Sequence, residues 1–459
     1  MTNRATLRIS NVGLRGIVGA GGMTAAHAMD FAAAFGEFLP DDGPVIISRD
    51  TRSSGVMFRE GIISSLQATG RPVVDLGVVS TPVLQHAIGA TPDAAGGISI
   101  SASHNGAEWN ALKFFGASGS YLSTAEAGEL LDIYHLRKFH FVDWTKVGGL
   151  THRETAIDDY LADLGRVFDF STLRQFRVVV DCCNGTSSVI LKRLIERHGF
   201  DRMTLLNTDG STFAHEPAIN KRMVQLQLAP LVGPLGADAG FLFDADSDRV
   251  AFATEKGEAV SEEMVLPLLA DHQLSRASGK LIITNLSTTA LLEEIAAKHG
   301  GTVIRVPVGR QAAMDALAVY KSGQIAIAGE GTGAVMMPQF RFVYDGIASM
   351  LAILTMMRER GQTLSELAGG YPKYSILKGQ VPLVSQRVPA LFMDLQERFR
   401  NERFSSVDGL RVEFANGAWA HVRVSQTEPI VRVICEQKGE APRALYDSIL
   451  ETVETYAAA

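Results

Sequence analysis

The segment 240–250, GFLFDADSDRV, carries the strongest signal for chemistry in the chain. An apolar run at 241–243 predicts a buried strand, and Asp244, Asp246 and Asp248 follow it at every second position. Alternate side chains of an extended segment point to the same side, so we expect the three carboxylates to face together. Neighbouring like charges repel unless a cation neutralises them, and an all-oxygen ligand set favours Mg²⁺ over zinc. A solvated acidic turn is the alternative interpretation.

The same carboxylates also imitate a calcium-binding loop. Asp244, Asp246, Asp248 and Glu255 have the spacing of the first, third, fifth and last ligands of an EF-hand. Arg249, however, stands where that loop needs a glycine for its sharp turn, and both flanks predict strands rather than helices. The sequence therefore argues against an EF-hand at this position.

A second reactive group is a serine at the end of a predicted strand. In segment 96–116, GGISISASHNGAEWNALKFFG, the alternation of Ile98 and Ile100 predicts a half-buried strand that leads into a polar loop. Ser103 begins that loop and His104 follows it. A serine in such a place can carry a covalent group if hydrogen-bond donors surround it. Taken alone, the tripeptide S-H-N is also typical of a turn with capping side chains.

A glycine-rich loop follows another predicted strand in segment 325–338, IAIAGEGTGAVMMP. Its glycines would let the backbone approach a ligand closely, and Glu330 could accept hydrogen bonds from sugar hydroxyls. The pattern lacks the third glycine of a dinucleotide fingerprint, and a Walker A sequence is absent from the chain. The loop is therefore predicted to bind a ligand other than a nucleotide.

The last segment with clustered donors is 423–436, RVSQTEPIVRVICE. Arg423, Ser425, Thr427 and Arg432 lie around a turn set by Pro429. Guanidinium groups and hydroxyls in this arrangement are suited to gripping a phosphate. A β-hairpin with solvated arginines is equally compatible with the pattern.

These segments need a scaffold that the 459 residues can supply, because a chain of this length exceeds one hydrophobic core. Apolar strands at 45–48, 178–181 and 281–284 each lead into helical periodicity, around 57–66, 189–194 and 291–296. From about Tyr374 the pattern changes to a strand, a helix over 389–399, three short strands ending at Glu436 and a closing helix. We predict an α/β protein with three similar mixed-sheet α/β domains and a smaller α+β C-terminal domain, around a central cleft. The predicted boundaries are 1–152, 153–257, 258–370 and 371–459.

Composition limits the classes of function. A net charge of −7 argues against a nucleic-acid-binding or membrane-surface protein, both of which favour basic surfaces. The longest apolar stretch, 346–357, is too short for a membrane span and predicts a buried helix. No apolar signal segment follows the first residues, and three cysteines form neither a disulfide framework nor a zinc pattern. We expect a cytoplasmic protein with buried cysteines, and the sequence leaves its oligomeric state open.

In this order, the four segments resemble the α-D-phosphohexomutase family, which includes phosphoglucomutase, phosphomannomutase and phosphoglucosamine mutase. The likeness extends over essentially the whole chain and includes VGLRG at 12–16, SRDTRSSG at 48–55 and VPVGR at 306–310. The resemblance implies reversible transfer of phosphate between the 1- and 6-positions of a hexose phosphate. It also implies a phosphoserine and a 1,6-bisphosphate intermediate.

The resemblance assigns roles to individual residues. Ser103 would be the phosphoserine, and its phosphate would complete the shell of one Mg²⁺ per chain with the three aspartates. Lys113 would act as general acid or base if burial among cations lowers its pKa. A phosphosugar would be the small-molecule partner, and a hexose 1,6-bisphosphate the activator. The remaining implied site residues are Arg15, His104, Arg249 and Arg310 at the reacting centre, Glu330 and Thr332 for the sugar, and Arg423, Ser425, Gln426, Thr427 and Arg432 for the phosphate.

Several positions depart from the family pattern. Gly106 replaces a proline after S-H-N, and Ala111 replaces a glycine before the lysine. Thr332 and Ala334 stand where many relatives have serine and histidine, and Arg310 replaces a frequent lysine or histidine. Because arginine hardly deprotonates, Arg310 is a poor proton-transfer group. These changes leave the sugar open, and we favour glucosamine phosphate over mannose or glucose phosphate.

Two other functions are compatible with parts of the pattern. A magnesium-dependent sugar phosphatase would share the nucleophile and the metal but release phosphate to water. A sugar-phosphate sensor without activity would be expected to lack Ser103, an aspartate or Lys113, and this sequence has all of them. The sugar loop and the C-terminal phosphate grip favour the mutase, because both serve to retain an intermediate.

Overall fold

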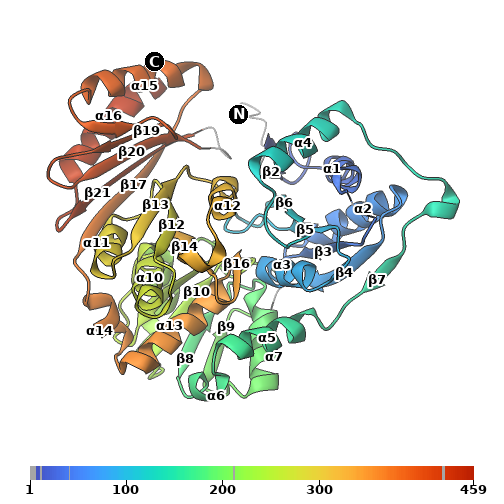
Figure 1. Cartoon of the computed structure of the whole chain (residues 1–459), viewed down its shortest axis with the longest axis horizontal. Coiled ribbons are helices and arrows are strands. Elements are labelled where there is room, and N and C mark those ends of the chain that lie inside the picture. The colour runs from blue at the N-terminus through green and yellow to red at the C-terminus, as the bar shows by residue number, and fades with distance from the viewer. Residues whose placement is uncertain (1–6, 11–12, 41, 210–211, 426–429, 459) are drawn as a thin grey trace.

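The computed structural model describes residues 7–10, 13–40, 42–209, 212–425 and 430–458. Within these residues the strands form four sheets that follow one another along the chain. Figure 1 shows their elements arranged as an arc, from the first sheet (blue) through the second (green) and third (yellow and orange) to the last (red). Helices lie between the strands of the first three groups, and the fourth is smaller. The predicted fold class is confirmed.

The first sheet positions the predicted serine loop. Its strands run in the order β1-β2-β6-β5-β3-β4-β7. Ile98 and Ile100 pack into a core with the helices α1 and α2, while Gly97 lies on the opposite face, where an added Cβ would be 2.4 Å from Ile88 of α3. The prediction of a half-buried strand was therefore wrong, because helices cover both faces and bury β5 completely. The elements are β1 (Arg8–Ser10), β2 (Gly13–Ile17), α1 (Ala25–Phe38), β3 (Val45–Arg49), α2 (Ser54–Ala68), β4 (Val73–Val78), α3 (Thr81–Gly89), β5 (Gly96–Ile100), β6 (Trp109–Gly116), α4 (Thr124–Leu136), η1 (Trp144–Lys146) and β7 (Leu150–His152).

The second sheet, in the order β11-β10-β8-β9, contains the strand that precedes the acidic segment. Phe241 and Phe243 of β10 join one core, and Leu242 joins another on the opposite face, so this strand is also buried on both sides. The elements are α5 (Ala156–Val167), α6 (Phe170–Leu173), β8 (Val178–Asp181), α7 (Ser187–His198), β9 (Met203–Leu206), α8 (Lys221–Met223), η2 (Val224–Leu228), α9 (Ala229–Val232), β10 (Ala239–Phe243) and β11 (Val250–Thr254).

The third sheet has the order β13-β12-β14-β15-β16 and presents the glycine-rich loop after β14. Strands β13, β12 and β14 are parallel, and β15 and β16 are added antiparallel. The predicted strands at 45–48, 178–181 and 281–284 correspond to β3, β8 and β12, and the predicted buried helix at 346–357 is α13. The elements are η3 (Glu262–Met264), α10 (Val265–Arg276), β12 (Leu281–Asn285), α11 (Leu291–Lys298), β13 (Thr302–Val306), α12 (Arg310–Val319), η4 (Ser322–Gln324), β14 (Ile325–Glu330), β15 (Ala334–Met337), β16 (Arg341–Tyr344), α13 (Gly346–Arg360) and α14 (Leu364–Gly369).

The last sheet is antiparallel, in the order β17-β21-β20-β19-β18, and has its own core around Leu391, Val433 and Ile449. Four strands follow α15 instead of the three predicted. The strand that the prediction missed is β18, an edge strand of three residues whose largely exposed side chains give no apolar alternation. The elements are β17 (Tyr374–Pro382), η5 (Ser385–Arg387), α15 (Val388–Arg398), β18 (Arg403–Ser405), β19 (Leu410–Glu413), β20 (Trp419–Val424), β21 (Ile430–Lys438) and α16 (Arg443–Ala458).

Two sequence-based expectations about the chain as a whole can be compared with the structure. The three cysteines, Cys182, Cys183 and Cys435, are buried and free, as expected. Within the described ranges, no helix is both long enough and apolar enough to span a bilayer.

The buried carboxylate of Asp271 links helices beside the third sheet to the segment that leads into the fourth sheet. Asp271 of α10 accepts hydrogen bonds from Lys298 (2.9 Å), His299 (2.7 Å), Arg360 (2.6 Å) and the Tyr371 hydroxyl (2.9 Å). Burial acts to raise the pKa of Asp271, but the hydrogen bonds from His299, Lys298, Arg360 and Tyr371 outweigh it and lower this pKa. The carboxylate thus stabilises the fold in its charged form.

Asp271→Asn is expected to lower the free energy of unfolding by about 1.5–3 kcal/mol at neutral pH, because charged hydrogen bonds are lost. A depressed carboxyl pKa stabilises the protein above the ordinary value of about 4, and this stabilisation disappears as the pH falls below it. Denaturation experiments should therefore show that the difference in unfolding free energy between the wild type and Asp271→Asn becomes smaller at acidic pH. Asp132→Asn, on the exposed side of α4, is the matched control. If the stability difference between the two proteins did not change with pH, Asp271 would not stabilise the fold through its charged form.

Candidate active site

The loop after β5 holds Ser103 in a fixed and unusual backbone conformation. Ser103 has φ of +50°, a left-handed value that non-glycine residues rarely adopt and that is common at functional sites. Its N–H donates to Ser101 Oγ (3.0 Å), and its carbonyl accepts from Arg52 Nη2 (3.0 Å). Arg52 is itself paired with the buried Asp50. These contacts set the direction in which the serine side chain leaves the loop.

The Ser103 hydroxyl points at the acidic segment of the second sheet. Ser103 Oγ donates a hydrogen bond to Asp244 Oδ2 at 2.6 Å, and both residues are at least 99% buried. The two residues are 141 positions apart in the sequence. The fold therefore brings the predicted nucleophile and the predicted metal ligands into direct contact.

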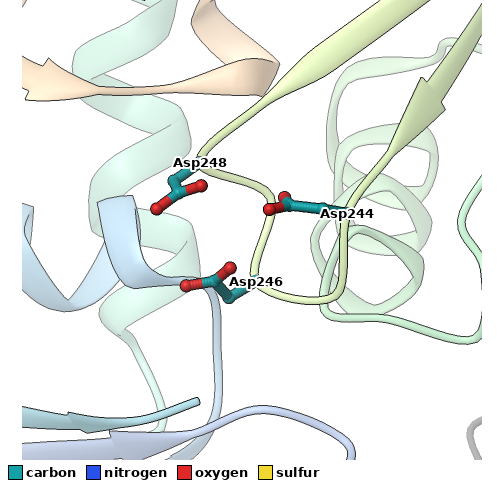
Figure 2. A group of neighbouring side chains, drawn as sticks. All are labelled: Asp244, Asp246 and Asp248. Carbon is teal, nitrogen blue, oxygen red and sulfur yellow. The ribbon is translucent and has the colours of Figure 1, made fainter. Parts of the chain in front are cut away.

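Asp244, Asp246 and Asp248 lie in the turn between β10 and β11 (Figure 2). The reason predicted for their convergence was wrong, because the segment is not extended: Ser247 adopts φ of +58° and its N–H donates to the Asp244 carbonyl. The turn, rather than strand alternation, gathers the side chains. Both flanks are strands, which rules out the helix-flanked EF-hand geometry.

The three carboxylates form a buried group of like charges. One oxygen from each lies within 4.8 Å of the others, and all three side chains are at least 99% buried, which excludes a solvated acidic turn. The Oδ1 atom of each aspartate is buried without a hydrogen-bond partner. Burial, followed by the charges of Asp248 and Asp246, raises the pKa of Asp244 well above its ordinary value. Among the residues that the structure describes, only Asp248 Oδ1 has a cationic neighbour, Arg249 Nε at 3.6 Å, and the three buried oxygens fit a hard divalent cation such as Mg²⁺.

Lys113 of β6 contacts the acidic turn from the first sheet. Its Nζ pairs with Asp246 and with Asp248 Oδ2, the latter at 3.0 Å. Burial acts to lower the pKa of Lys113, but the charges of Asp246 and Asp248 outweigh it and raise this pKa. The expectation that Lys113 lies among cations that lower its pKa was therefore wrong, since carboxylates are its direct partners.

Arginines converge beside the turn. Arg310 Nη2 donates to Asp248 Oδ2 (2.7 Å), and Arg15 Nη1 donates to Asn105 Oδ1 (2.8 Å). Burial, together with the positive charges of Arg310 and Arg249, lowers the pKa of Arg15 to about 10. Burial and the charges of Arg249 and Arg15 also hold the pKa of His104 well below its ordinary value, so this imidazole is neutral. This surplus of positive charge is suited to an anionic ligand.

A cleft connects these residues with the third and fourth sheets. Nine of the predicted site residues line it. One of them, Arg310, also contacts Asp248, which is not among the lining residues. The lining residues that the sequence predicted are Arg15, His104, Arg249, Arg310, Glu330, Thr332, Arg423, Ser425 and Arg432. The predicted residues Gln426 and Thr427 lie outside the described part of the chain.

The loop after β14 presents Glu330 and Thr332 to the cleft. Glu330 Oε1 accepts from the Tyr344 hydroxyl (3.1 Å), and Thr332 Oγ1 is buried without a partner. One glycine of the loop has a packing role: an added Cβ at Gly333 would lie 2.2 Å from the Val250 carbonyl oxygen of β11. The sugar loop and the acidic turn thus share the strand β11 as a neighbour.

The last sheet contributes Arg423 and Arg432, which are paired across β20 and β21. Arg423 Nε contacts Asp408 Oδ2 at 3.2 Å, and the same oxygen accepts from the Val308 N–H at 2.8 Å. Asp408 therefore connects β20 to the segment that precedes Arg310. Sequence reasoning missed Asp408, because nothing in its local pattern distinguishes it from an ordinary turn residue.

Four further residues that sequence reasoning did not assign also line the cleft. They belong to segments whose motifs were noticed, namely S-H-N and VPVGR. Gly309 has φ of +143°, and this backbone value, favoured by glycine, lets the chain turn into α12 so that Arg310 begins the helix. Gly309 within VPVGR is the sequence feature that could have predicted this turn into the helix. The four residues are Asn105, Trp109, Val308 and Gly309.

Comparisons with known proteins agree with this geometry. Residues 9–140, 158–257 and 261–374 match the α/β/α domains I, II and III of phosphoglucomutase/phosphomannomutase. A phosphoglucomutase/phosphomannomutase from Thermococcus kodakarensis is 32% identical over 437 residues, covering 93% of this chain and 94% of the relative. A protein from Pyrococcus horikoshii, named as a probable phosphoglucosamine mutase, is 33% identical over 423 residues and 91% of each chain.

Solved structures show the same fold. A phosphoglucomutase/phosphomannomutase family protein from Burkholderia thailandensis superposes with a TM-score of 0.79 at 23% identity, over 98% of this chain and 97% of that one. An Aspergillus fumigatus N-acetylphosphoglucosamine mutase gives a TM-score of 0.61 at 15% identity, over 98% and 95% of the two chains. From the domain matches and the full-length relatives, the chain belongs to the phosphoglucomutase/phosphomannomutase family of α-D-phosphohexomutases, enzymes that transfer phosphate between positions of a hexose phosphate.

Proposed function

We propose that this phosphohexomutase carries its phosphoryl group on Ser103 and exchanges phosphate between the 1- and 6-positions of glucosamine phosphate. The observation that carries the proposal is the 2.6 Å contact between Ser103 Oγ and Asp244 Oδ2. It joins a buried nucleophile to a turn whose three carboxylates each offer an oxygen within 4.8 Å of the others, close enough to share a cation. We also propose the domain boundaries predicted above, 1–152, 153–257, 258–370 and 371–459.

The proposed cycle begins with phosphate on Ser103. The free hydroxyl of a bound hexose phosphate attacks phosphorus, the bond to Ser103 Oγ breaks, and the acceptor hydroxyl loses its proton. The hexose 1,6-bisphosphate formed in this step turns around in the cleft. Its other phosphoryl group then returns to Ser103 Oγ, and the isomeric monophosphate leaves. Added hexose 1,6-bisphosphate would phosphorylate a bare Ser103 and so act as the activator.

The residues around Ser103 meet the electrostatic needs of this transfer. Asp244, Asp246 and Asp248 would hold the magnesium ion, which supplies charge neutralisation at the transferred phosphoryl group when bound. Lys113 and Arg310 restrain Asp248 and add positive charge. Proton transfer at the acceptor hydroxyl is proposed for His104, whose neutral imidazole can accept a proton, whereas the raised pKa of Lys113 suits it to donate one. Arginine hardly deprotonates and is not proposed for this step.

The far side of the cleft would grip the phosphate that does not react. Arg423, Ser425 and Arg432 are proposed to bind it in both orientations of the sugar, with Gln426 and Thr427 of the same loop. Because this grip belongs to a sheet with its own core, we propose that it closes over the substrate and keeps water from Ser103.

Glucosamine phosphate is proposed as the preferred sugar. Several relatives that match about nine-tenths of this chain at 30% identity or more are named as probable phosphoglucosamine mutases. Glu330 and Thr332 line the cleft and would bind the sugar, because the carboxylate accepts and the buried Thr332 hydroxyl has no protein partner.

Ser103→Ala is expected to abolish mutase turnover while leaving the fold intact, because the variant cannot carry the phosphoryl group. A coupled assay measures the rate, and phosphopeptide analysis should find one phosphoryl group at Ser103 in the unaltered protein. Ser65→Ala is the matched control, since it removes a buried hydroxyl that donates to Met29 far from the site. Mutase activity retained by Ser103→Ala would remove the nucleophile assignment. Free phosphate released in step with substrate loss would instead indicate a phosphatase.

Removal of metal should stop turnover, and added Mg²⁺ should restore it. Mg²⁺ should also raise the melting temperature of the wild type, because it binds the folded state. Asp244→Asn should lose this rise, yet its metal-free form should melt no lower than the wild type, because one of three repelling charges is gone. Thermal unfolding in chelator and in Mg²⁺ measures both effects. An equal Mg²⁺-dependent rise in the variant would exclude Asp244 as a ligand.

Across a panel of hexose 6-phosphates, kcat/KM should be highest for glucosamine 6-phosphate. Glu330→Gln should lower kcat/KM for every sugar by about 10-fold or more, because a charge-assisted acceptor is lost. A coupled assay that found mannose or glucose phosphate to be the better substrate would reject the sugar assignment.

A further inference from the structure

Thr81, which neither the family resemblance nor the proposed cycle assigns, contacts the acidic turn directly. It is the first residue of α3, beside the first sheet, and its side chain is completely buried. Its hydroxyl donates to Asp246 Oδ2, and its N–H donates to the Asp246 carbonyl at 3.2 Å. The two bonds hold Asp246 from both its backbone and its side chain.

The hydrogens around Thr81 can be assigned consistently. The single hydroxyl hydrogen goes to the carboxylate, which has none to give. Ser99 Oγ lies 3.2 Å from Thr81 Oγ1 and can donate to it, and Lys113 Nζ approaches the same oxygen at 3.5 Å. Ser99 and Lys113 are opposite each other on β5 and β6. Thr81 thus contacts β5, the strand that leads into the Ser103 loop, and β6, the strand that carries Lys113.

The three aspartates follow one pattern. In each, Oδ2 accepts from side chains outside the turn, and Oδ1 is buried without a hydrogen-bond partner, although Arg249 Nε approaches Oδ1 of Asp248 at 3.6 Å. Ser103 holds Oδ2 of Asp244, and Lys113 with Arg310 holds Oδ2 of Asp248. For Asp246 the donors are Thr81 and Lys113.

We infer that Thr81 is a positioning residue for the metal site, whose hydroxyl fixes Oδ2 of Asp246 and so keeps Oδ1 available to a divalent cation. Without the Thr81 hydroxyl, Lys113 alone would hold Oδ2 of Asp246, and the carboxylate could rotate more freely to offer either oxygen. Partners that orient metal ligands typically contribute 10–100-fold to affinity or activity. The inference rests on the proposed function, because it takes the three aspartates as metal ligands.

Mn²⁺ binding to the full, dephosphorylated chain, followed by electron paramagnetic resonance and displaced by Mg²⁺, tests this role without turnover. Thr81→Val keeps the shape of the side chain and removes the donor, so it should bind Mn²⁺ about 10–100-fold more weakly. Thr81→Ser keeps the hydroxyl and should bind close to wild type. At saturating Mg²⁺, the KM of Thr81→Val for the sugar phosphate should be unchanged. Thr81→Ala supplies the comparison if Thr81→Val does not fold.

Thr69→Val is the matched control, because it removes a hydroxyl that donates to the Leu66 carbonyl (2.8 Å) at the end of α2 and does not contact the turn. It should bind Mn²⁺ like the wild type. Equal binding by Thr81→Val and wild type would overturn the role of Thr81 and leave the metal site standing. Weak binding by both Thr81→Ser and Thr81→Val would also overturn it, since the hydroxyl would not be the cause. Absence of Mn²⁺ binding by the wild type would overturn the metal site itself.

Discussion

Three carboxylates packed into one buried turn repel one another, and the surrounding structure is arranged to hold them together. Burial and mutual repulsion raise the pKa of Asp244, whereas Asp248 has cationic partners that lower its pKa. Lys113 and Arg310 reach the turn from different sheets to provide this compensation. One oxygen of each aspartate still accepts no hydrogen bond, and within the described part of the chain only that of Asp248 has a cationic neighbour, Arg249, so the charge compensation is incomplete. A divalent cation would complete it.

The cleft beside the turn has an excess of positive charge, opposite to the excess of negative charge in the turn. Burial and the nearby positive charges of Arg310 and Arg249 lower the pKa of Arg15. Such a group of cations is stabilised when an anion enters, as a phosphosugar would. Ser103 contacts the acidic turn, and the next two residues, His104 and Asn105, line the positive cleft. Once a divalent cation was held by the turn, a phosphoryl group on Ser103 would have positive charge on both sides. The neutral His104 on the lining adds no further positive charge.

The site is assembled from four sheets, and several contacts fix their relative positions. Gly333 packs against the carbonyl of Val250, which places the sugar loop beside the strand that follows the acidic turn. Asp408 accepts from both Arg423 and Val308 and so joins the phosphate grip to the segment before Arg310. These contacts are local in space and distant in sequence. They explain why residues from every sheet reach one cleft.

The sequence by itself determined the strands, because apolar runs at 178–181 and 281–284 must be buried whatever their neighbours. It also determined which residue types were available for chemistry, including Ser103 and the three aspartates. The local geometry predicted from the sequence was wrong in two places. Ser247 turns the acidic segment instead of extending it, and helices bury β5 on both faces. Side-chain periodicity does not report a left-handed residue or the partner that covers a strand.

Only the tertiary structure decided the electrostatics and the contacts between sheets. Lys113 was expected among cations and lies among carboxylates, because its neighbours come from a segment more than a hundred residues away. Thr81 and Asp408 have no local pattern that marks them, and their importance follows from the atoms they meet. The sequence lists charges and hydrogen-bond donors in order along the chain. Interaction energies depend on distance and burial, and folding alone sets both.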